Sequence, residues 1–297
     1  MKRRDDVFTR RDFLRGTAYT TIAAVLGKER FNAQPPERHA RAKVVLVRHP
    51  DALDRSRNPN ANVIQHMLDE GVRTLLEIEN TAGAWRHLLK TDDLVGIKSN
   101  VWAYLPTPKE VENAIRRRII DSGVPGDRIR MDDRGALKSL ADCTTLINVR
   151  PLRTHHWSGI GGCLKNYIMF VESPYRYHPN SCASLGHIWT LPVVKDKTRL
   201  NVLVVLRPIF HGRGPHHYNP KYQWDYKGML ISTDPVAADS IGVRLLSAKR
   251  RDYFGEDTPF PTRAHHVMYA DIKYNVGVSD PRRIDLVKVG WTQGVLI

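Results

Sequence analysis

The stretch Leu146–Asn166, with the sequence LINVRPLRTHHWSGIGGCLKN, contains the residues of this chain that are best suited to chemistry. His155 and His156 follow an apolar run of strand length, and imidazoles serve as acid–base groups and metal ligands near neutral pH. Seven of the 13 histidines fall between positions 155 and 217. We therefore expect a catalytic or ligand-binding site here, with one histidine of the pair acting on the ligand and the other supporting it. A structural hydrogen-bonding role is the alternative for either one.

Glycines just before an expected helix over residues 163–171 indicate an anion site. Glycine permits close backbone approach, and the free N–H groups of a helix N-terminus attract phosphate or carboxylate. We expect Gly161, Gly162, Lys165 and Asn166 to bind a small anionic ligand. The spacing matches neither the P-loop nor the dinucleotide fingerprint. The alternative is that the glycines only allow tight packing of a helix on a sheet.

Lys98 and Asn100 stand at the end of another apolar run, LVGIK at residues 94–98. In open parallel sheets, ligands bind at the carboxyl ends of strands. Both side chains are therefore expected to line the same crevice as the Leu146–Asn166 stretch, although a lysine leaving a strand is often simply solvated.

Asp239 falls on the apolar side of a helix expected over residues 235–248, next to Gly242, Val243 and Leu246. Asp234 and Pro235 are typical of the start of that helix. A carboxylate on an apolar stripe must be paired, hydrogen-bonded or neutral. Asp239 is thus a candidate catalytic residue, and a structural partnership with a buried arginine or a backbone amide is the alternative.

A single transition-metal site is one further hypothesis. His155, His178, Cys182 and Cys163 supply imidazole and thiol ligands, but their spacing belongs to no diagnostic metal motif. The alternative is that these histidines bind an organic anion, act as acid–base groups or fill loops. Three cysteines without a Cys-x-x-Cys pair do not predict an iron–sulfur cluster, and a Cys163–Cys182 disulfide is open in an oxidising compartment.

The first 34 residues resemble a twin-arginine export signal. A basic segment, TRRDFLR at residues 9–15, precedes a short apolar run over residues 16–27. That run is shorter than the roughly 20 residues that a membrane span needs, so a permanent span is not expected. We expect a cleaved signal, transient contact with the export machinery and a periplasmic or other extracytoplasmic location. A basic amphipathic helix that is never exported is the alternative.

The remaining chain predicts an α/β fold. After a polar linker over residues 35–42, expected strands at 43–48, 94–98, 128–132, 144–149, 201–206 and 284–289, most of them continuous apolar runs, alternate with helical segments. Continuous rather than alternating runs indicate a mostly parallel sheet with helices on both faces. We expect a single domain over residues 43–297, with long loops at the carboxyl edge of the sheet.

The net charge of +15 invites a nucleic-acid interpretation. However, residues 1–34 contain eight basic and four acidic residues, so removing them leaves 15 − 4 = +11, spread along the chain. Nucleic-acid modules and basic–aromatic patterns are missing from the sequence, so no nucleic-acid partner is expected.

The motifs together resemble the family called domain of unknown function 362, from about residue 43 to the C-terminus. The similar segments are GIKSN (96–100), TP (107–108), THH (154–156), LKN (164–166), RYH (176–178) and STDPVAAD (232–239). The resemblance implies an α/β domain of unsettled activity, in some members preceded by an export signal or fused to iron–sulfur modules. No cysteine-rich module is present here, so iron–sulfur binding is not carried over. Arg153 replaces a common lysine and Val204–Val205 a common acidic residue, so roles of those groups are not carried over either.

Three functions are compatible with these observations. The first is an exported enzyme, with redox or metal chemistry among its options, that binds a small anionic substrate and uses His155 for acid–base chemistry or ligation, with Asp239 and His178 as partners. The second is an extracytoplasmic metal- or anion-binding protein without catalysis. The third is a structural partner of an exported complex, which would use the aromatic loop at 218–226.

Overall fold

The apolar runs form one central sheet in the computed structural model, which describes residues 41–212, 218–256 and 258–297. The sheet has the strand order β3-β2-β4-β6-β7-β1-β8, and β5 pairs with β4. The strands are β1 (Ala42–Arg48), β2 (Val95–Lys98), β3 (Ile129–Asp132), β4 (Thr145–His155), β5 (Gly159–Gly161), β6 (Thr198–Ile209), β7 (Gly228–Ser232) and β8 (Ile284–Gly290).

The sheet is mostly parallel, as the sequence predicts. The pairs β3–β2, β2–β4, β4–β6 and β1–β8 are parallel, whereas β7 runs antiparallel to both of its neighbours, β6 and β1. Strand β7 is not predicted from the sequence, because its apolar run of only three residues, Met229–Ile231, follows directly after a long irregular segment. The carboxyl ends of β2 and β4 consequently lie side by side at one edge.

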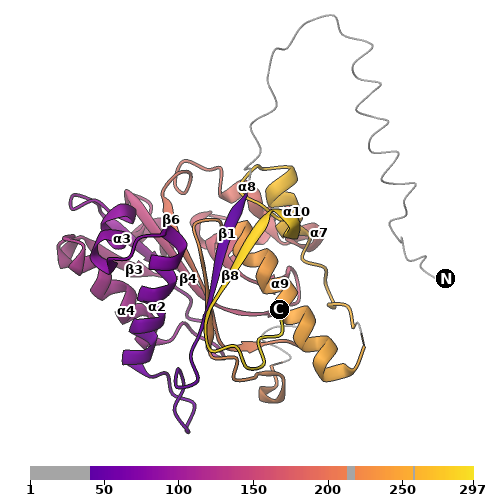
Figure 1. The fold of residues 1–297 in the computed structure, drawn as a ribbon. Helices are drawn as coiled ribbons and strands as arrows, with labels where there is room; N and C mark the ends of the chain where they lie inside the picture. Colours follow the sequence, from indigo (N-terminus) through magenta and orange to yellow (C-terminus); the bar gives the residue numbers. More distant parts are fainter. Residues whose placement is uncertain (1–40, 213–217, 257) are drawn as a thin grey trace, which may run out of the picture. The chain divides into compact units, whose positions relative to one another are not determined.

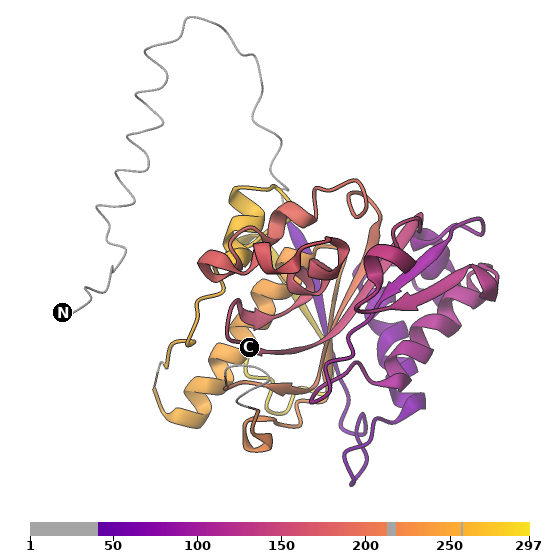
Figure 2. The same cartoon turned by 180° about the vertical axis from the view of Figure 1, so that it is seen from behind.

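Helices cover both faces of this sheet (Figure 1). The α-helices of the described residues are α2 (Ala61–Leu76), α3 (Thr81–Leu88), α4 (Lys109–Asp121), α5 (Ala136–Ser139), α6 (Cys163–Asn166), α7 (Pro179–Cys182), α8 (Leu185–Ile188), α9 (Pro235–Phe254) and α10 (His265–Ile272). Successive residues of a strand point to opposite faces. Val45 and Val47 therefore pack in the core under α2, α3 and α4, and Val44 and Leu46 in the core under α9. Figure 2 shows the short helices α6–α8 on the same side as α9 and α10.

Two residues of types that often mark helix ends do not do so here. Gly71 lies inside α2, where a Cβ would come within 2.4 Å of the Ile231 side chain on the sheet, so this glycine permits close packing of the helix on β7. Thr107 does not cap α4, which begins after Pro108; the Thr107 hydroxyl accepts a hydrogen bond from the Asn100 amide instead.

Strand β4 is longer than the expected run at 144–149 and extends to His155. The histidine pair therefore begins on the strand itself rather than in a loop several residues beyond it. The expected helix at 163–171 is one α-helical turn, α6, followed by a 3₁₀ helix over Tyr167–Phe170.

The proposed signal at residues 1–34 and most of the linker lie outside the described residues. None of the helices in the described ranges has the length and apolar character of a membrane span.

Replacing Asp234 with alanine tests the capping of α9. The Asp234 carboxylate accepts hydrogen bonds from the amides of Val236 and Ala237 at the helix start and from Val278 across the fold. Loss of a cap of this kind costs about 1–2 kcal/mol. We expect Asp234→Ala to lower the free energy of unfolding in urea by at least this amount, while Asp51→Ala in an exposed turn leaves it within experimental error. Equal unfolding midpoints for the two variants would refute this assignment.

Candidate functional site

Polar and charged side chains converge at the carboxyl edge formed by β2 and β4. They surround a cavity of about 160 Å³. Its polar and aromatic lining consists of Asn100, Trp102, Asp133, Arg134, Arg150, Arg153, His155, Lys165 and Asn166. Four residues predicted from the sequence, Asn100, His155, Lys165 and Asn166, are thus brought together. The arginines and Asp133 were not predicted.

Asn166 is the hub of a buried hydrogen-bond network beneath the cavity. Its side-chain amide donates to the carbonyl of Lys98 at 3.1 Å and to Asn148 Oδ1 at 2.8 Å, and its oxygen accepts from Asn100 at 3.4 Å. Asn148 in turn donates to Asn201 on β6 at 3.0 Å. The network therefore links three neighbouring parallel strands and fixes the position of α6 above them.

Lys98 is fully buried and already satisfied by the protein. Its ammonium donates to Asp133, to the Ser99 carbonyl at 2.7 Å and to Asn166 at 3.3 Å. Burial lowers the pKa of Lys98 to about 8, and the charge of Asp133 opposes this change. Lys98 thus links Asp133, Ser99 and Asn166 beneath the cavity and does not line it.

Asp239 occupies the start of α6, where the sequence analysis placed an external anion. Its two oxygens accept hydrogen bonds from the amides of Cys163 at 2.6 Å and Leu164 at 2.9 Å. A Cβ on Gly162 would lie 2.1 Å from Asp239 Oδ1. Of the two alternatives for Asp239, the structure thus supports a partnership with backbone amides. The helix N-terminus is occupied by the protein's own carboxylate, and Gly162 makes room for it.

Arg150 and Arg153 enter the cavity from β4. A Cβ on Gly161 would lie 2.9 Å from an Arg150 guanidinium nitrogen and 3.4 Å from Arg153 Cγ, so this glycine makes room for both arginines. Arg150 donates to the Gly162 carbonyl, and Arg153 donates to the Thr154 carbonyl and stacks on Trp102 at 4.0 Å. Among the described residues, the Nε groups of both arginines are buried without an acceptor. Burial lowers the pKa of Arg153 well below its usual value, and the charge of Arg150 lowers it further.

Lys165 is the third cation of the cavity. Its Nζ is buried, and within the described part of the chain no oxygen or nitrogen accepts a hydrogen bond from it. Burial lowers the pKa of Lys165 to about 8; the nearby Cys182 thiol opposes this, and the charges of Arg150 and Arg153 add to it. Because burial also raises the pKa of Cys182, the thiol is neutral at pH 7 and does not balance the lysine charge.

His155 faces these cations as a neutral imidazole. Burial, and then the charges of Arg153 and Lys165, hold its pKa far below the usual value. Its Nδ1 accepts a hydrogen bond from the Trp157 amide at 3.2 Å, so the ring proton must be on Nε2. His155 is therefore a hydrogen-bond donor in a cavity already rich in donors.

The other predicted histidines form an aromatic wall beside the cavity. The ring of His156 lies parallel to that of His155 at 5.1 Å, and Trp157 packs against His156 at 4.0 Å and against His178 at 3.9 Å. Burial lowers the pKa of His178 to about 4, and the charge of Lys165 contributes. Only His155 of this group lines the cavity, and His156 supports it through ring contact.

The structure does not bring His155, His178, Cys182 and Cys163 together as a set of metal ligands. Among the described residues, no three histidine, cysteine, aspartate or glutamate side chains are placed to hold a metal ion. Cys163 lies on α6 against Asp239, whereas Cys182 lies beside Lys165. All three cysteines are free and buried, so the Cys163–Cys182 disulfide is not formed in this structure.

Residues 110–244 match the model of the family described as "Domain of unknown function (DUF362)". The match supports the family resemblance. No curated protein and no solved structure matches the chain. The matched segment contains Asp133, Arg150, Arg153, Lys165 and Asp239, and it begins after Lys98 and Asn100. Because the family description names no activity, the function of the cavity must be argued from its own chemistry.

The capping role of Asp239 predicts a distinct dependence of stability on pH. Burial raises the pKa of Asp239 to about 6, against the lowering effect of its two amide partners. An acid whose pKa is raised by folding stabilises the protein below its unfolded pKa of 3.8, and this stabilisation is lost as the pH rises to about 6. We expect wild-type protein to lose about 2 kcal/mol relative to Asp239→Asn between pH 4 and 6.

Urea unfolding of both proteins across this pH range measures the difference. Asp252→Asn, which removes an exposed carboxylate, is the matched control and should follow the wild-type curve. If the curves of wild type and Asp239→Asn run parallel, Asp239 is not held as a buried carboxylate.

Proposed function

We propose that this chain binds a small, doubly charged anion, with carboxylate or phosphate groups, in the cavity at the carboxyl edge of its sheet. One observation carries the proposal: three buried cations, Arg150, Arg153 and Lys165, surround one cavity, and within the described residues neither arginine Nε nor the lysine Nζ has an oxygen or nitrogen acceptor. The ligand would supply the missing acceptors.

The local charge balance supports a dianion. Lys98, Arg150, Arg153 and Lys165 are buried here, against two buried carboxylates, Asp133 and Asp239, which leaves an excess of 4 − 2 = +2. Unpaired buried charges strongly destabilise the folded state, so their presence favours a site at which a ligand of opposite charge binds. Bidentate guanidinium groups match the geometry of carboxylate and phosphate, and the Nε2–H of His155 adds a neutral donor.

The geometry supports binding more directly than turnover. His155 is neutral throughout the physiological pH range and so cannot donate a proton as an imidazolium acid. Asp239, the other predicted catalytic group, is bound to the amides of α6. An enzymatic role would require the bound anion to raise the pKa of His155, and simple binding requires no such change. Metal-dependent and redox chemistry have no support from side-chain placement in the described residues.

We also propose that the protein is exported, and this part of the proposal rests only on the sequence of residues 1–34. In that case the anion would be taken up outside the cytoplasm, and the twin-arginine pathway would deliver the protein already folded.

Replacing Arg153 with methionine should separate stability from binding. Replacing an unpaired buried cation with an apolar side chain of similar length is neutral or stabilising for the fold. We expect the melting temperature of ligand-free Arg153→Met to equal or exceed that of wild type. Phosphate and malonate should raise the melting temperature of wild type, by the equivalent of about 2.7 kcal/mol at one hundred times Kd, and should not raise that of the variant.

The matched control is Arg55→Met, which removes an exposed arginine far along the chain from the cavity. It should respond to both anions as wild type does. The proposal fails if neither anion stabilises wild type, or if Arg153→Met keeps the full response.

The pKa of Lys165 predicts how binding depends on pH. The lysine must be protonated to attract an anion, and its pKa in the empty cavity is about 8. We expect Kd for malonate, which is fully ionised in this range, to be constant from pH 7 to about 8. Above this it should rise by up to about tenfold per pH unit, by linkage. Calorimetric titration of wild type and Lys165→Met measures it.

Lys98 also has a pKa of about 8, so the variant is needed to assign the change. Lys165→Met should bind malonate more weakly at pH 7 and show a flatter profile above pH 8. If Kd of Lys165→Met begins to rise at the same pH as Kd of wild type, the titrating group is Lys98 instead.

A further inference from the structure

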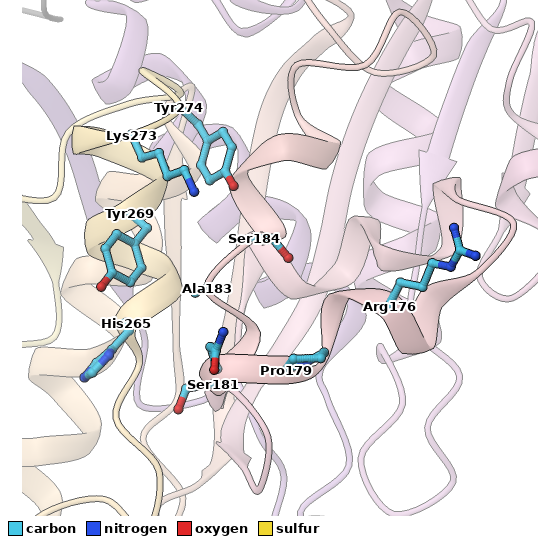
Figure 3. Close-up of a pocket in the computed structure, with 10 residues that line it drawn as sticks. Arg176, Pro179, Ser181, Ala183, Ser184, His265, Tyr269, Lys273 and Tyr274 are labelled. Carbon is cyan, nitrogen blue, oxygen red and sulfur yellow. The ribbon is translucent and has the colours of Figure 1, made fainter.

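A second cavity, of about 720 Å³, lies between α10 and the segment at 179–184 (Figure 3). This volume is within the range of cavities that bind organic molecules, whereas the anion cavity is much smaller, at about 160 Å³. Its α10 side is formed by Tyr269, Lys273 and Tyr274. Its opposite side is formed by small polar side chains, Asn180, Ser181 and Ser184.

The polar wall is built on a strained turn. Asn180, Ser181 and Cys182 all have left-handed backbone conformations, with φ of 52°, 56° and 60°. Non-glycine residues rarely adopt this conformation, and strain of this kind is concentrated at ligand sites. The turn directs Asn180 and Ser181 to the cavity and buries Cys182 on its other side.

The aromatic wall is held rigidly. Gly186 on α8 lies so close to Tyr274 that a Cβ there would come within 2.5 Å of the ring. The Tyr274 ring also contacts His187 at 6.3 Å, and His187 Nδ1 is hydrogen-bonded to the Tyr177 hydroxyl at 3.1 Å. A ring fixed on its packed side offers a preorganised surface for stacking on the open side.

The charge of the cavity is positive. Lys273 is exposed, and its Nζ lies over the Tyr274 ring, 5.3 Å from the ring centre; Figure 3 shows the lysine side chain extending towards that ring. The carboxylate of Asp271 on α10 is engaged elsewhere, because it accepts hydrogen bonds from the amide and hydroxyl of Ser279. Among the described residues that line the cavity there is no aspartate or glutamate.

We infer that this cavity is a second ligand site, separate from the anion cavity, for a planar ring that carries a phosphate. The ring would stack beside Tyr269 and Tyr274, Lys273 would pair with the phosphate, and the Ser181 and Ser184 hydroxyls would bind polar ring substituents. A nucleotide and an aryl phosphate share this chemistry.

Titration with adenosine monophosphate and phenyl phosphate tests the inference. We expect at least one of them to bind wild type, and Lys273→Ala and Tyr269→Ala each to weaken binding by about tenfold, as for the loss of one charge-assisted contact or one ring contact. Lys288→Ala, at an exposed lysine that does not line the cavity, should bind as wild type does. Binding of adenosine monophosphate alone would identify a nucleotide site, and binding of phenyl phosphate an aryl phosphate site.

Arg153→Met distinguishes this site from the anion cavity. If both ligands bind only through their phosphate in the anion cavity, Arg153→Met will abolish binding and Lys273→Ala will leave it unchanged, which overturns the second site but not the first. Failure of both ligands to bind wild type also overturns the inference. Retained binding in Arg153→Met, together with loss of binding in Lys273→Ala, supports the second site even if the anion cavity binds neither phosphate nor malonate.

Discussion

The pair of hydrogen bonds from the amides of Cys163 and Leu164 to Asp239 fixes the geometry on which the rest of the site depends. Helix α6 is a single turn and could not hold its own orientation by backbone bonding alone. The fully buried Asp239 carboxylate ties the start of α6 to α9, which lies on the same face of the sheet, and Gly162 permits the approach. Lys165 and Asn166 follow on the same turn. The position of Asp239 therefore sets the position of the Lys165 ammonium in the cavity and of the Asn166 amide at the centre of the strand network.

The buried cations explain why such a rigid frame is useful. Arg150, Arg153 and Lys165 repel one another, and each lowers the proton affinity of a neighbour. A flexible edge would relieve this repulsion by moving the side chains into solvent. The asparagine network below, the Trp102 ring against Arg153 and the absence of a Cβ at Gly161 hold them in place instead. The free-energy cost of burying these like charges is thus concentrated in one cavity. A bound anion there would attract each cation and so offset that cost.

The sequence predicts the layers of this fold better than its site. Continuous apolar runs such as KVVLVR identify most of the strands, and the Asp234–Pro235 pair identifies the start of α9. The short β7 and the glycines inside helices could not be assigned, because their roles are set by contacts distant in sequence, as for Gly71 against Ile231. At the site, the same limit applies. Helical spacing showed that Asp239 is buried but not that it binds α6, so the amides of α6 were expected to face a ligand. Arg150 and Arg153 were the available signal, because they are the only arginine or lysine residues in a strand that is buried along its whole length.

The strained turn at 180–182 connects the two cavities physically. Its first two residues line the cavity beside α10, and its third places a neutral thiol next to Lys165. Because left-handed conformations of three successive non-glycine residues are held only by surrounding contacts, a ligand that packs on Asn180 and Ser181 would favour this turn over a relaxed one. The same turn defines the environment of the Lys165 ammonium.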